Sequence, residues 1–443
     1  MPTLRSQQRE AASNIRTHST LLLADVGAGK TATALTAIGG RALFYGRQRT
    51  LVVGTRRICK SVWGAEVEKW LPGYAYDTVA ELKPDKRRAI LEDDSILIVG
   101  INFENLAWAF GEYGSRLAGM FPQLVIDESS RLENPASKTF RIIDEHLHEF
   151  EWRLPMTGTP QANHLEDIWG SVYLADLGRA LGRYKDAFLQ NYFHPIRRHD
   201  RLAWIPKHGA AEAIHKRLTE NAATHRMPFV WHAPVEIDVL LPINPEVTWI
   251  IKRIDDELAE SPDVTIKGVT YARNGQRVYL KMLQLSAGLV YDDEGNIQYL
   301  HQDKLFALKE IADEAHGEPV MVVFQFEHER DAILEMFPQA RLLDNDDTLA
   351  EWNDGKIEML LVHPKSCGYG LNAQLSGCDV QVWFTPTPDA ELYGQTIGRL
   401  NRPGNEKVIR VFRLIMKGTK DKASYMVVAA RQKGERATLD MYE

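Results

Sequence analysis

Short runs of apolar, often β-branched residues alternate with longer segments of helical period along most of the chain. Continuous apolar runs are typical of strands buried on both faces, and the segments between them fit crossover helices. In the first half we expect strands at residues 20–24, 51–54, 96–100, 124–126 and 153–156. In the second half we expect them at residues 320–324, 359–362, 380–384 and 409–414. The pattern predicts an α/β protein with two parallel sheets, each wrapped by helices.

The stretch between the two halves, residues 170–299, is less regular. It combines helical segments with aromatic residues and one strand-like run at residues 235–241. We expect a first domain at residues 1–235, with a mostly helical insertion from about residue 170, and a second domain at residues 236–443. A basic run in the insertion fits a nucleic-acid contact as well as it fits a solvated helical face. Its members are Arg197, Arg198, Arg201, Lys207, Lys216 and Arg217.

The composition limits the class of protein. With 443 residues, 44% of them hydrophobic, the chain is long enough for two or three globular domains. Its 3 cysteines, Cys59, Cys367 and Cys378, form no CxxC pair, which excludes a disulfide framework and a zinc module. A polar N-terminus and the lack of any long apolar window predict a protein of the cytoplasm, without a membrane partner. The formal net charge of −7 argues mildly against a nucleic-acid partner.

The strongest local signal is residues 21–31, Leu-Leu-Leu-Ala-Asp-Val-Gly-Ala-Gly-Lys-Thr, an apolar strand and a small-residue loop that lead into a helix. Backbone N–H groups of such a loop surround phosphate oxygens at the positive end of the helix dipole. Lys30 would supply charge to the β- and γ-phosphates, and the Thr31 hydroxyl would bind magnesium. The usual first glycine is Ala24 here, and an ordinary turn before a helix is the alternative. The expected nucleotide-binding residues are Val26, Gly27, Ala28, Gly29, Lys30, Thr31 and Ala32.

Two carboxylates follow the apolar run at residues 124–126. Asp127 and Glu128 would therefore emerge at the carboxyl edge of the sheet, where ligands bind in open α/β folds. We expect Asp127 to bind the nucleotide and its magnesium ion, and Glu128 to act as the base that polarises the attacking water. An apolar strand followed by Asp-Glu is a weak motif alone, and it gains weight downstream of a phosphate loop.

Taken together, these motifs resemble superfamily 2 helicase-like ATPases, and within them the Swi/Snf-related DNA translocases. Residues 4–9, Leu-Arg-Ser-Gln-Gln-Arg, resemble the stretch that places Gln8, with Arg5 beside it, against the adenine. Residues 51–55, followed by Trp63, resemble motif Ia. Residues 131–139 resemble the box Arg-Ile-Lys-Asn-Pro-x-Ser-Lys-Thr, and residues 154–163 resemble Leu-Thr-Gly-Thr-Pro-x-x-Asn. The resemblance covers nearly the whole chain and implies two RecA-like domains that bind ATP and Mg²⁺ in the cleft between them.

The second half carries the remaining motifs of the resemblance. Residues 366–372 are similar to motif V, which brings Gly370 to the nucleotide, and residues 395–405 are similar to motif VI with its Gln395. Arg399 and Arg402 are three apart, so we expect them on one face of a helix. The resemblance implies that both arginines reach the γ-phosphate, which would make hydrolysis depend on closure of the cleft. Departures from the family pattern are Ser6, Ser130 and Asn405.

The resemblance also implies a track that grips DNA phosphates and reads no bases, so low sequence specificity and strong salt dependence are expected. The candidate DNA-binding residues are Thr55, Asn102, Gln325, Lys365 and Ser366. The compact size looks like the minimal versions of bacteriophages and bacteria. A monomer would be catalytically complete.

We therefore expect a DNA-dependent ATPase that moves along duplex or branched DNA and remodels DNA or protein–DNA complexes. A strand-separating helicase of the same superfamily is one alternative, since the middle of the chain could hold a β-hairpin wedge. A non-hydrolysing nucleic-acid-binding scaffold is the other, and the full catalytic set argues against it.

Overall fold

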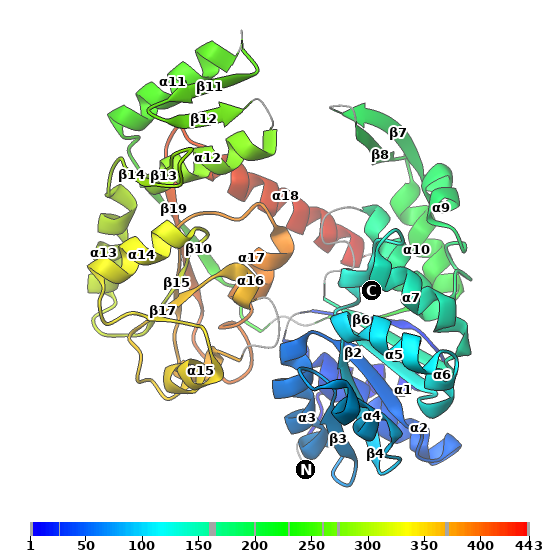
Figure 1. Ribbon diagram of the computed structural model, residues 1–443. Coiled ribbons are helices and arrows are strands. Elements are labelled where there is room, and N and C mark those ends of the chain that lie inside the picture. The colour runs from blue at the N-terminus through cyan, green and yellow to red at the C-terminus, as the bar shows by residue number, and fades with distance from the viewer. Residues whose placement is uncertain are drawn as a thin grey trace. The chain divides into compact units, whose positions relative to one another are not determined.

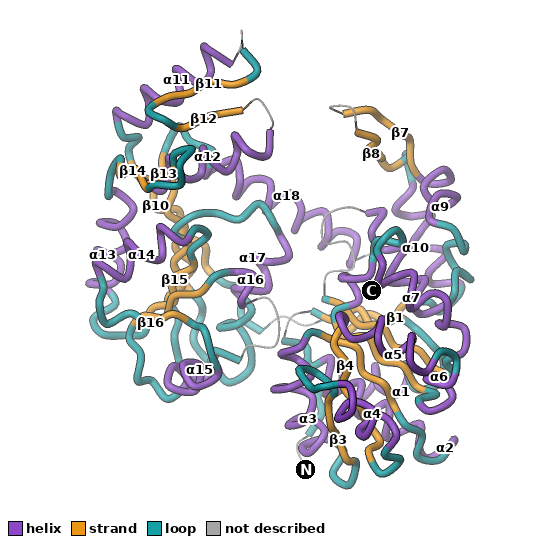
Figure 2. The backbone as a smooth tube through the Cα atoms, viewed as in Figure 1, coloured by secondary structure: helices purple, strands orange, loops and turns teal. Residues whose placement is uncertain are grey.

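The computed structural model describes residues 3–25, 27–158, 165–198, 201–228, 231–258, 261–272, 275–367 and 372–440. The chain divides into two compact units, one formed by residues 1–230 with 433–443 and the other by residues 231–432. Each unit is built on its own parallel sheet, drawn as orange strands in Figure 2. No helix within the described residues is both long and apolar enough to cross a bilayer.

The sheet of the first unit has seven strands in the order β3-β4-β2-β5-β6-β1-β9. All its pairings are parallel. The strands are β1 (Leu21–Ala24), β2 (Thr50–Gly54), β3 (Ala75–Thr78), β4 (Ile96–Asn102), β5 (Gln123–Asp127), β6 (Trp152–Thr157) and β9 (Thr224–Met227). Strands β1, β2 and β5 are buried along their whole length, as their continuous apolar sequences predicted. The short, partly exposed strands β3 and β9 were not predicted.

Helices connect these strands (Figure 1). They are α1 (Ser6–Ile15), α2 (Lys30–Tyr45), α3 (Trp63–Trp70), α4 (Pro84–Glu92), α5 (Leu106–Tyr113), α6 (Arg116–Met120), α7 (Lys138–His146), α8 (Ile168–Asp176), α9 (Lys185–Tyr192) and α10 (Ala210–Glu220). A turn of π-helix, Ile58–Val62, precedes α3. Side chains from β1, β2, β4 and β5 and the covering helices form one large apolar core.

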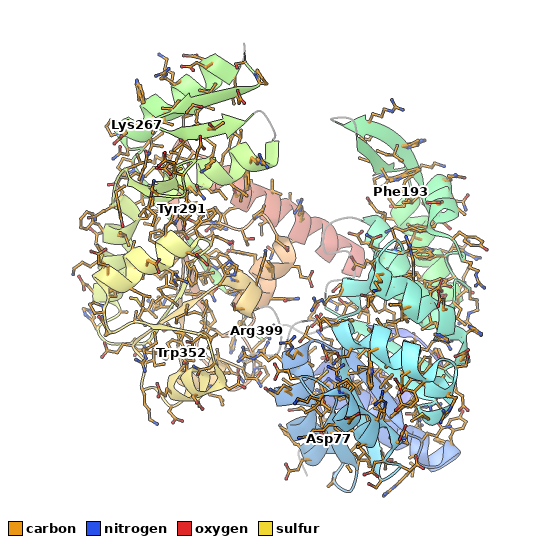
Figure 3. All side chains as sticks on the ribbon, viewed as in Figure 1. Asp77, Phe193, Lys267, Tyr291, Trp352 and Arg399 are labelled. Atoms are coloured by element: carbon orange, nitrogen blue, oxygen red, sulfur yellow. The ribbon has the colours of Figure 1, made fainter. Side chains whose placement is uncertain are left out.

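A β-hairpin separates α9 from α10 in the insertion. Strands β7 (Phe193–Arg198) and β8 (Arg201–Pro206) pair antiparallel, and Figure 1 shows them projecting beyond the neighbouring helices. Phe193, labelled in Figure 3, is buried at the foot of the hairpin, and Trp204 packs against the core. The basic run therefore starts on a projecting β-ribbon, so a helical face does not describe Arg197, Arg198 and Arg201.

The sheet of the second unit has six parallel strands in the order β10-β19-β18-β15-β17-β16. They are β10 (Val235–Leu241), β15 (Val320–Val323), β16 (Arg341–Leu342), β17 (Met359–Val362), β18 (Val380–Trp383) and β19 (Arg410–Met416). The prediction of an α/β protein with two parallel sheets is confirmed.

The helices of this unit are α11 (Pro245–Leu258), α12 (Gly275–Ala287), α13 (Asp303–Glu314), α14 (Glu327–Met336), α15 (Asp346–Asn353), α16 (Pro364–Cys367) and α17 (Ala390–Ile397). The last helix, α18 (Asp421–Asp440), begins in this unit, and its residues from 433 onward group with the first. Two small antiparallel hairpins pair β11 (Asp263–Ile266) with β12 (Val269–Ala272), and β13 (Leu289–Tyr291) with β14 (Ile297–Tyr299).

Candidate nucleotide site

The glycine-rich segment forms the expected loop between β1 and α2. Gly27 and Gly29 have φ angles of +80° and +84°, a left-handed conformation that strains any other residue. The N–H of Ala28 donates to the carbonyl of Asp25 over 3.0 Å and closes the turn. Gly29 is the N-cap of α2, so Lys30 and the two predicted residues that follow it, Thr31 and Ala32, lie in the first helical turn. Val26 lies outside the described residues.

Arg5 and Gln8 contact this loop directly. The side-chain amide of Gln8 donates to the carbonyl of Ala28 over 3.2 Å, and its Oε1 accepts the N–H of Arg5 over 2.9 Å. The guanidinium of Arg5 donates to the carbonyls of Gly27 and Ala28. A Cβ placed on Gly29 would lie only 2.2 Å from Nε2 of Gln8. The N-terminal helix therefore packs its polar end against the phosphate loop.

Lys30, Asp127 and Glu128 meet at the carboxyl ends of β1 and β5. The Nζ atom of Lys30 lies 3.6 Å from Oε1 of Glu128. Glu128 has a φ of +61°, and a left-handed backbone at a residue with a side chain is uncommon and often marks a functional position. The indole N–H of buried Trp63 donates to Oδ2 of Asp127 over 3.0 Å. The resemblance to motif Ia included Trp63 but assigned it no role, and the structure shows that it holds the carboxylate of Asp127.

The environment of Asp127 disfavours the charged form of its carboxyl group. Burial and the neighbouring Glu128 raise its pKa to about 6, and the opposing effects of Lys30 and of the Trp63 hydrogen bond are smaller. A bound cation would stabilise the charged form. Mg²⁺ usually takes one or two protein oxygens and completes its shell with phosphates and water. The Asp127 carboxylate and the Thr31 hydroxyl fit that donor set, and no group of three His, Cys, Asp or Glu side chains among the described residues offers another metal site.

In the second unit, Arg399 and Arg402 do not lie on a helix. Helix α17 ends at Ile397 with Gly398 as its C-cap, and both arginines follow in turns. The expectation of one helical face was wrong because α17 ends at Ile397, where Gly398, a residue of low helix propensity, is the C-cap. Arg399, labelled in Figure 3, is 7% exposed and lies in the turn directly after α17.

Arg402 joins two of the motifs of this unit. Its Nε donates to the carbonyl of Gly398 over 2.7 Å, and its Nη1 donates to Oδ1 of Asn372 over 2.8 Å. Burial and the neighbouring Arg399 cation lower the pKa of Arg402, because both disfavour its positive charge. An anion bound beside Arg402 would stabilise that charge. Gln395 is buried and donates to Glu391 over 2.8 Å. Gly370 and residues 159–164 lie outside the described part of the chain.

The candidate DNA-binding residues differ in exposure. Thr55 and Asn102 are buried, and their side chains stabilise strand-end turns: Thr55 accepts the N–H of Ile58, and Asn102 bonds Glu104. Gln325 lies between β15 and α14, where its N–H donates to Glu329. The side chains of the remaining two candidates, Lys365 and Ser366, are exposed on the short helix α16.

A glycine-rich loop beside an Asp-Glu pair in one α/β unit, with a second α/β unit that carries Arg399 and Arg402, is the arrangement expected of a P-loop ATPase with two lobes. A family model of the SNF2-related domain matches residues 7–222. Protein p41 of Acyrthosiphon pisum secondary endosymbiont phage 1 is 30% identical over 443 residues, which cover 94% of this chain and 93% of that protein. The chain belongs to the SNF2-related family of ATPases.

Other similarities are more distant. The DNA excision repair protein ERCC-6-like of Danio rerio is 26% identical over 215 residues, 47% of this chain, and the match spans only 14% of that protein. The SWI2/SNF2 ATPase core of Sulfolobus solfataricus, solved in complex with dsDNA, shares 19% identity over 98% of this chain and 92% of that chain, with a TM-score of 0.43.

Proposed function

We propose that this protein is a DNA-dependent ATPase that couples ATP hydrolysis to movement along duplex DNA. The observation that carries the proposal is the gathering of Lys30, Asp127 and Glu128 at one sheet edge of an SNF2-family ATPase. The match to a DNA excision repair protein favours DNA as the polymer. Remodelling of DNA or of protein–DNA complexes would be the outcome of such movement.

The candidate site residues of the first lobe would have different roles in hydrolysis. The loop N–H groups and Lys30 bind the phosphates, and Arg5 and Gln8 hold the loop beside the base. Asp127 and Thr31 would hold Mg²⁺, which supplies neutralising charge to the phosphates. Glu128 orients a water molecule and accepts its proton, with the ammonium of Lys30 3.6 Å away. ATP binding would draw Lys30 toward phosphate and free the Glu128 carboxylate for the water.

The second lobe supplies positive charge for the transition state. Arg399 and Arg402 would contact the γ-phosphate when the two lobes close, and one such arginine contributes about 10³-fold or more to kcat. Gln395 and Gly370 would complete this side of the site. Because the arginines and the phosphate loop belong to different lobes, hydrolysis would require the lobes to close. Repeated closing and opening would then move the protein stepwise along DNA.

Contacts to DNA would come mainly from exposed groups. Lys365 and Ser366 are exposed and suit phosphates, and the projecting β7–β8 hairpin adds the charge of Arg197 and its neighbours. Thr55 and Asn102 would contribute through backbone atoms at their strand ends, since their side chains are engaged. Gln325 would do the same at the end of β15.

The decisive experiment compares ATP hydrolysis with no polymer, duplex DNA, single-stranded DNA and RNA. Duplex DNA should stimulate most, and equal rates in all tubes would overturn the DNA-motor proposal. In parallel, Glu128→Gln should bind ATP as the wild type does yet hydrolyse it about 10²–10⁴-fold more slowly, as expected for loss of a general base. Near-normal turnover in that variant would show that Glu128 is not the base.

The β7–β8 hairpin keeps a second candidate function open, a strand-separating helicase. Hairpins at a duplex junction can split base pairs, and Leu202 near the end of this hairpin is 63% exposed. Displacement of a labelled strand from a forked substrate distinguishes the two. A translocase hydrolyses ATP on the fork without releasing the strand, and a helicase releases it.

A further inference from the structure

Trp63, at the start of α3, contacts the carboxylate of Asp127 at the end of β5. Its indole N–H donates to Oδ2 of Asp127 over 3.0 Å, although 64 residues of sequence separate the two. Trp63 is completely buried, and Asp127 is 5% exposed. A hydrogen bond to a buried carboxylate restricts the rotation of that carboxylate, and hydrogen bonds of this kind orient the ligands of metal ions.

The acceptor distinguishes Trp63 from other buried tryptophans. A buried indole N–H needs an acceptor, and a backbone carbonyl satisfies it as well as a carboxylate does. Within the described residues, three other tryptophans are less than 2% exposed. Trp152 and Trp352 donate to backbone carbonyls, and Trp383 donates to the amide oxygen of Gln381. Trp63 instead donates to the carboxylate that we expect to bind Mg²⁺.

A turn of π-helix directs Trp63 toward this carboxylate. The turn covers Ile58–Val62, and the N–H of Trp63 donates to the carbonyl of Ile58, five residues earlier. A π turn contains one residue more than an α turn, so it rotates the helix that follows by about 100°. Such turns are frequent at functional sites. Without the extra residue, the side chain of Trp63 would leave α3 in a different direction.

Residues of three neighbouring strands fix the π turn. In a regular α-helix the carbonyl of Cys59 would accept the N–H of Trp63, but here the hydroxyl of Tyr76 on β3 donates to it. Gly100 on β4 leaves room for that hydroxyl, since an added Cβ would lie 2.2 Å from its oxygen. Thr55, directly after β2, accepts the N–H of Cys59 at its carbonyl over 3.0 Å. The direction of Trp63 is therefore determined by the surrounding sheet.

We propose that Trp63 and Tyr76 are positioning residues for Asp127. Tyr76 stabilises the π turn, the turn directs the indole of Trp63 to Oδ2, and the carboxylate is thereby oriented before Mg²⁺ and ATP bind. Neither residue is among the proposed ligands of the nucleotide or of the ion. They therefore affect the contribution of the metal to binding and leave the affinity for metal-free nucleotide unchanged. This proposal rests on the proposed function, in which Asp127 holds Mg²⁺.

The first experiment separates the effect of the metal from that of the nucleotide. The Kd of a fluorescent ATP analogue is measured in EDTA and in Mg²⁺, and the ratio of the two values gives the contribution of the metal. Trp63→Phe keeps an aromatic ring and removes the N–H. It should reduce this ratio about tenfold, raise the Mg²⁺ concentration for half-maximal hydrolysis about tenfold and leave the Kd in EDTA unchanged.

Trp152→Phe is the matched control for this variant. Trp152 is also buried in the first unit, and its indole N–H donates to the carbonyl of Ile15 over 3.0 Å. Trp152→Phe should lower the Tm and leave the ratio at the wild-type value. If Trp63→Phe behaves in the same way, the hydrogen bond to Asp127 is merely structural and the proposal is wrong.

Two further variants separate hydrogen bonding from packing. Trp63→β-(3-benzothienyl)alanine exchanges the N–H for sulfur in a side chain of the same shape, and it should repeat the effect of Trp63→Phe. Tyr76→Phe removes only the hydroxyl and should reduce the ratio about threefold. Tyr113→Phe is its control, because the hydroxyl of Tyr113 donates to Glu92 over 3.0 Å, away from the π turn. A wild-type ratio in the benzothienyl variant would overturn the role of Trp63, and one in Tyr76→Phe would overturn that of Tyr76.

The outcomes also separate this proposal from the proposed function. The titrations need no DNA, so they decide the roles of Trp63 and Tyr76 even if no polymer stimulates the wild type and the motor proposal fails. A wild-type ratio close to one would show that Asp127 holds no metal, which would overturn both proposals. A wild-type ratio well above one that Trp63→Phe leaves unchanged would overturn only the positioning proposal.

Discussion

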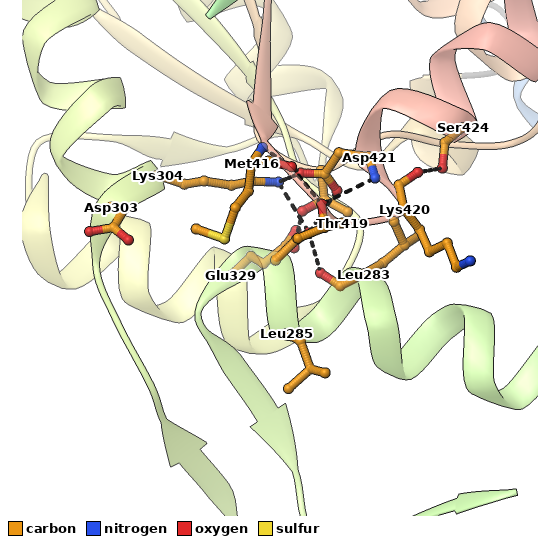
Figure 4. A network of polar contacts seen from close by, with 12 residues as sticks. Leu283, Leu285, Asp303, Lys304, Glu329, Met416, Thr419, Lys420, Asp421 and Ser424 are labelled. Atoms are coloured by element: carbon orange, nitrogen blue, oxygen red, sulfur yellow. Dashed lines mark hydrogen bonds and ion pairs between the residues drawn. The ribbon is translucent and has the colours of Figure 1, made fainter. Parts of the chain in front are cut away.

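The Nζ atom of Lys304 lies 2.8 Å from Oδ2 of Asp421, and both side chains are completely buried. Ser286 donates to Oδ1 of Asp421 over 2.6 Å. The N–H of Met416 donates to Oδ2 over 3.0 Å, and Figure 4 shows Lys304, Met416 and Asp421 within this network. These contacts join α12, α13, the end of β19 and the start of α18. The carboxylate is therefore satisfied by one cation and two hydrogen bonds at the junction of four elements of the second lobe.

Removal of one member of this pair should be costly. Lys304→Met or Asp421→Asn leaves a buried charge without its partner, so we expect a loss of about 3–5 kcal/mol in the free energy of unfolding. The double variant Lys304→Met/Asp421→Asn should lose less than the sum of the two single variants, since it removes both charges. Lys309→Met is the control, because Lys309 and Asp313 form an exposed pair that is worth about 0.5 kcal/mol or less. Urea unfolding followed by circular dichroism checks all four, and wild-type stability in Lys304→Met would contradict the prediction.

Gly29 should tolerate no side chain. In Gly29→Ala the new Cβ would meet Nε2 of Gln8 at 2.2 Å and would occupy a φ of +84°. Gly377→Ala is matched, because Gly377 has a left-handed backbone with a φ of +70° and no atom lies within 4 Å of the position that its Cβ would take. Both variants should lose about 1 kcal/mol of stability through the left-handed backbone, but only Gly29→Ala should lose ATP binding. Titration with a fluorescent ATP analogue distinguishes them. Equal affinities would show that contact between Gln8 and the loop is not needed.

The strands that carry the phosphate loop and the carboxylates were predictable from the sequence. Both β1 and β5 are buried on two faces, and such strands have continuous apolar sequences. Strands β3 and β9 were missed, since a partly exposed strand of four residues has no such pattern. The sequence left a β-hairpin in the middle of the chain as an alternative but did not place β7 and β8, whose alternation is interrupted by Pro195 and by the arginines. The placement of Arg399 and Arg402 on one helix failed because α17 ends before them, at Ile397 with Gly398 as its C-cap.

The residues that support the site depend on contacts over long stretches of sequence. Trp63 reaches Asp127 across 64 residues and Arg226 reaches Asp25 across 201. Neither pair has a spacing that a local pattern could reveal, because it exists only once the strands are ordered in the sheet. Nothing in the local sequence around Arg226 singled it out, since the strand that carries it, β9, was itself not predicted. The residues of the candidate site were therefore predictable from local motifs, and the distant residues that hold them in place were not.

The β7–β8 hairpin should account for part of the DNA affinity. The triple variant Arg197→Gln/Arg198→Gln/Arg201→Gln should weaken duplex binding and reduce the slope of log Kd against log salt by about 1–3, since each lost phosphate contact is worth about 0.9. ATP hydrolysis without DNA should be unchanged. Lys216→Gln is the control on α10, where Lys216 lies 3.9 Å from Glu220. Fluorescence anisotropy at several salt concentrations provides the slopes. An unchanged slope in the triple variant would show that the hairpin arginines do not contact DNA phosphates.

His328 should make the second lobe sensitive to mild acid. The ring is buried, stacks on Tyr291 with centroids 4.8 Å apart and meets Phe326 edge-on. Burial lowers its pKa from 6.5 to about 4, and the nearby Asp331 and the backbone of Leu289 offset only part of this effect, while Lys281 adds to it. The unfolded chain therefore binds a proton between pH 6.5 and 4 that the folded lobe does not.

Stability from His328 is consequently full above about pH 6.5 and is lost as the pH falls toward 4, by at most about 3 kcal/mol. His328→Phe keeps a ring against Tyr291 and removes the titration. Carboxylates titrate in the same range in both proteins, so the informative quantity is the difference between the variant and the wild type. The free energy of unfolding should favour the variant increasingly as the pH falls from 7.5 to 5. A constant difference across that range would show that His328 has the same pKa in the folded lobe as in the unfolded chain.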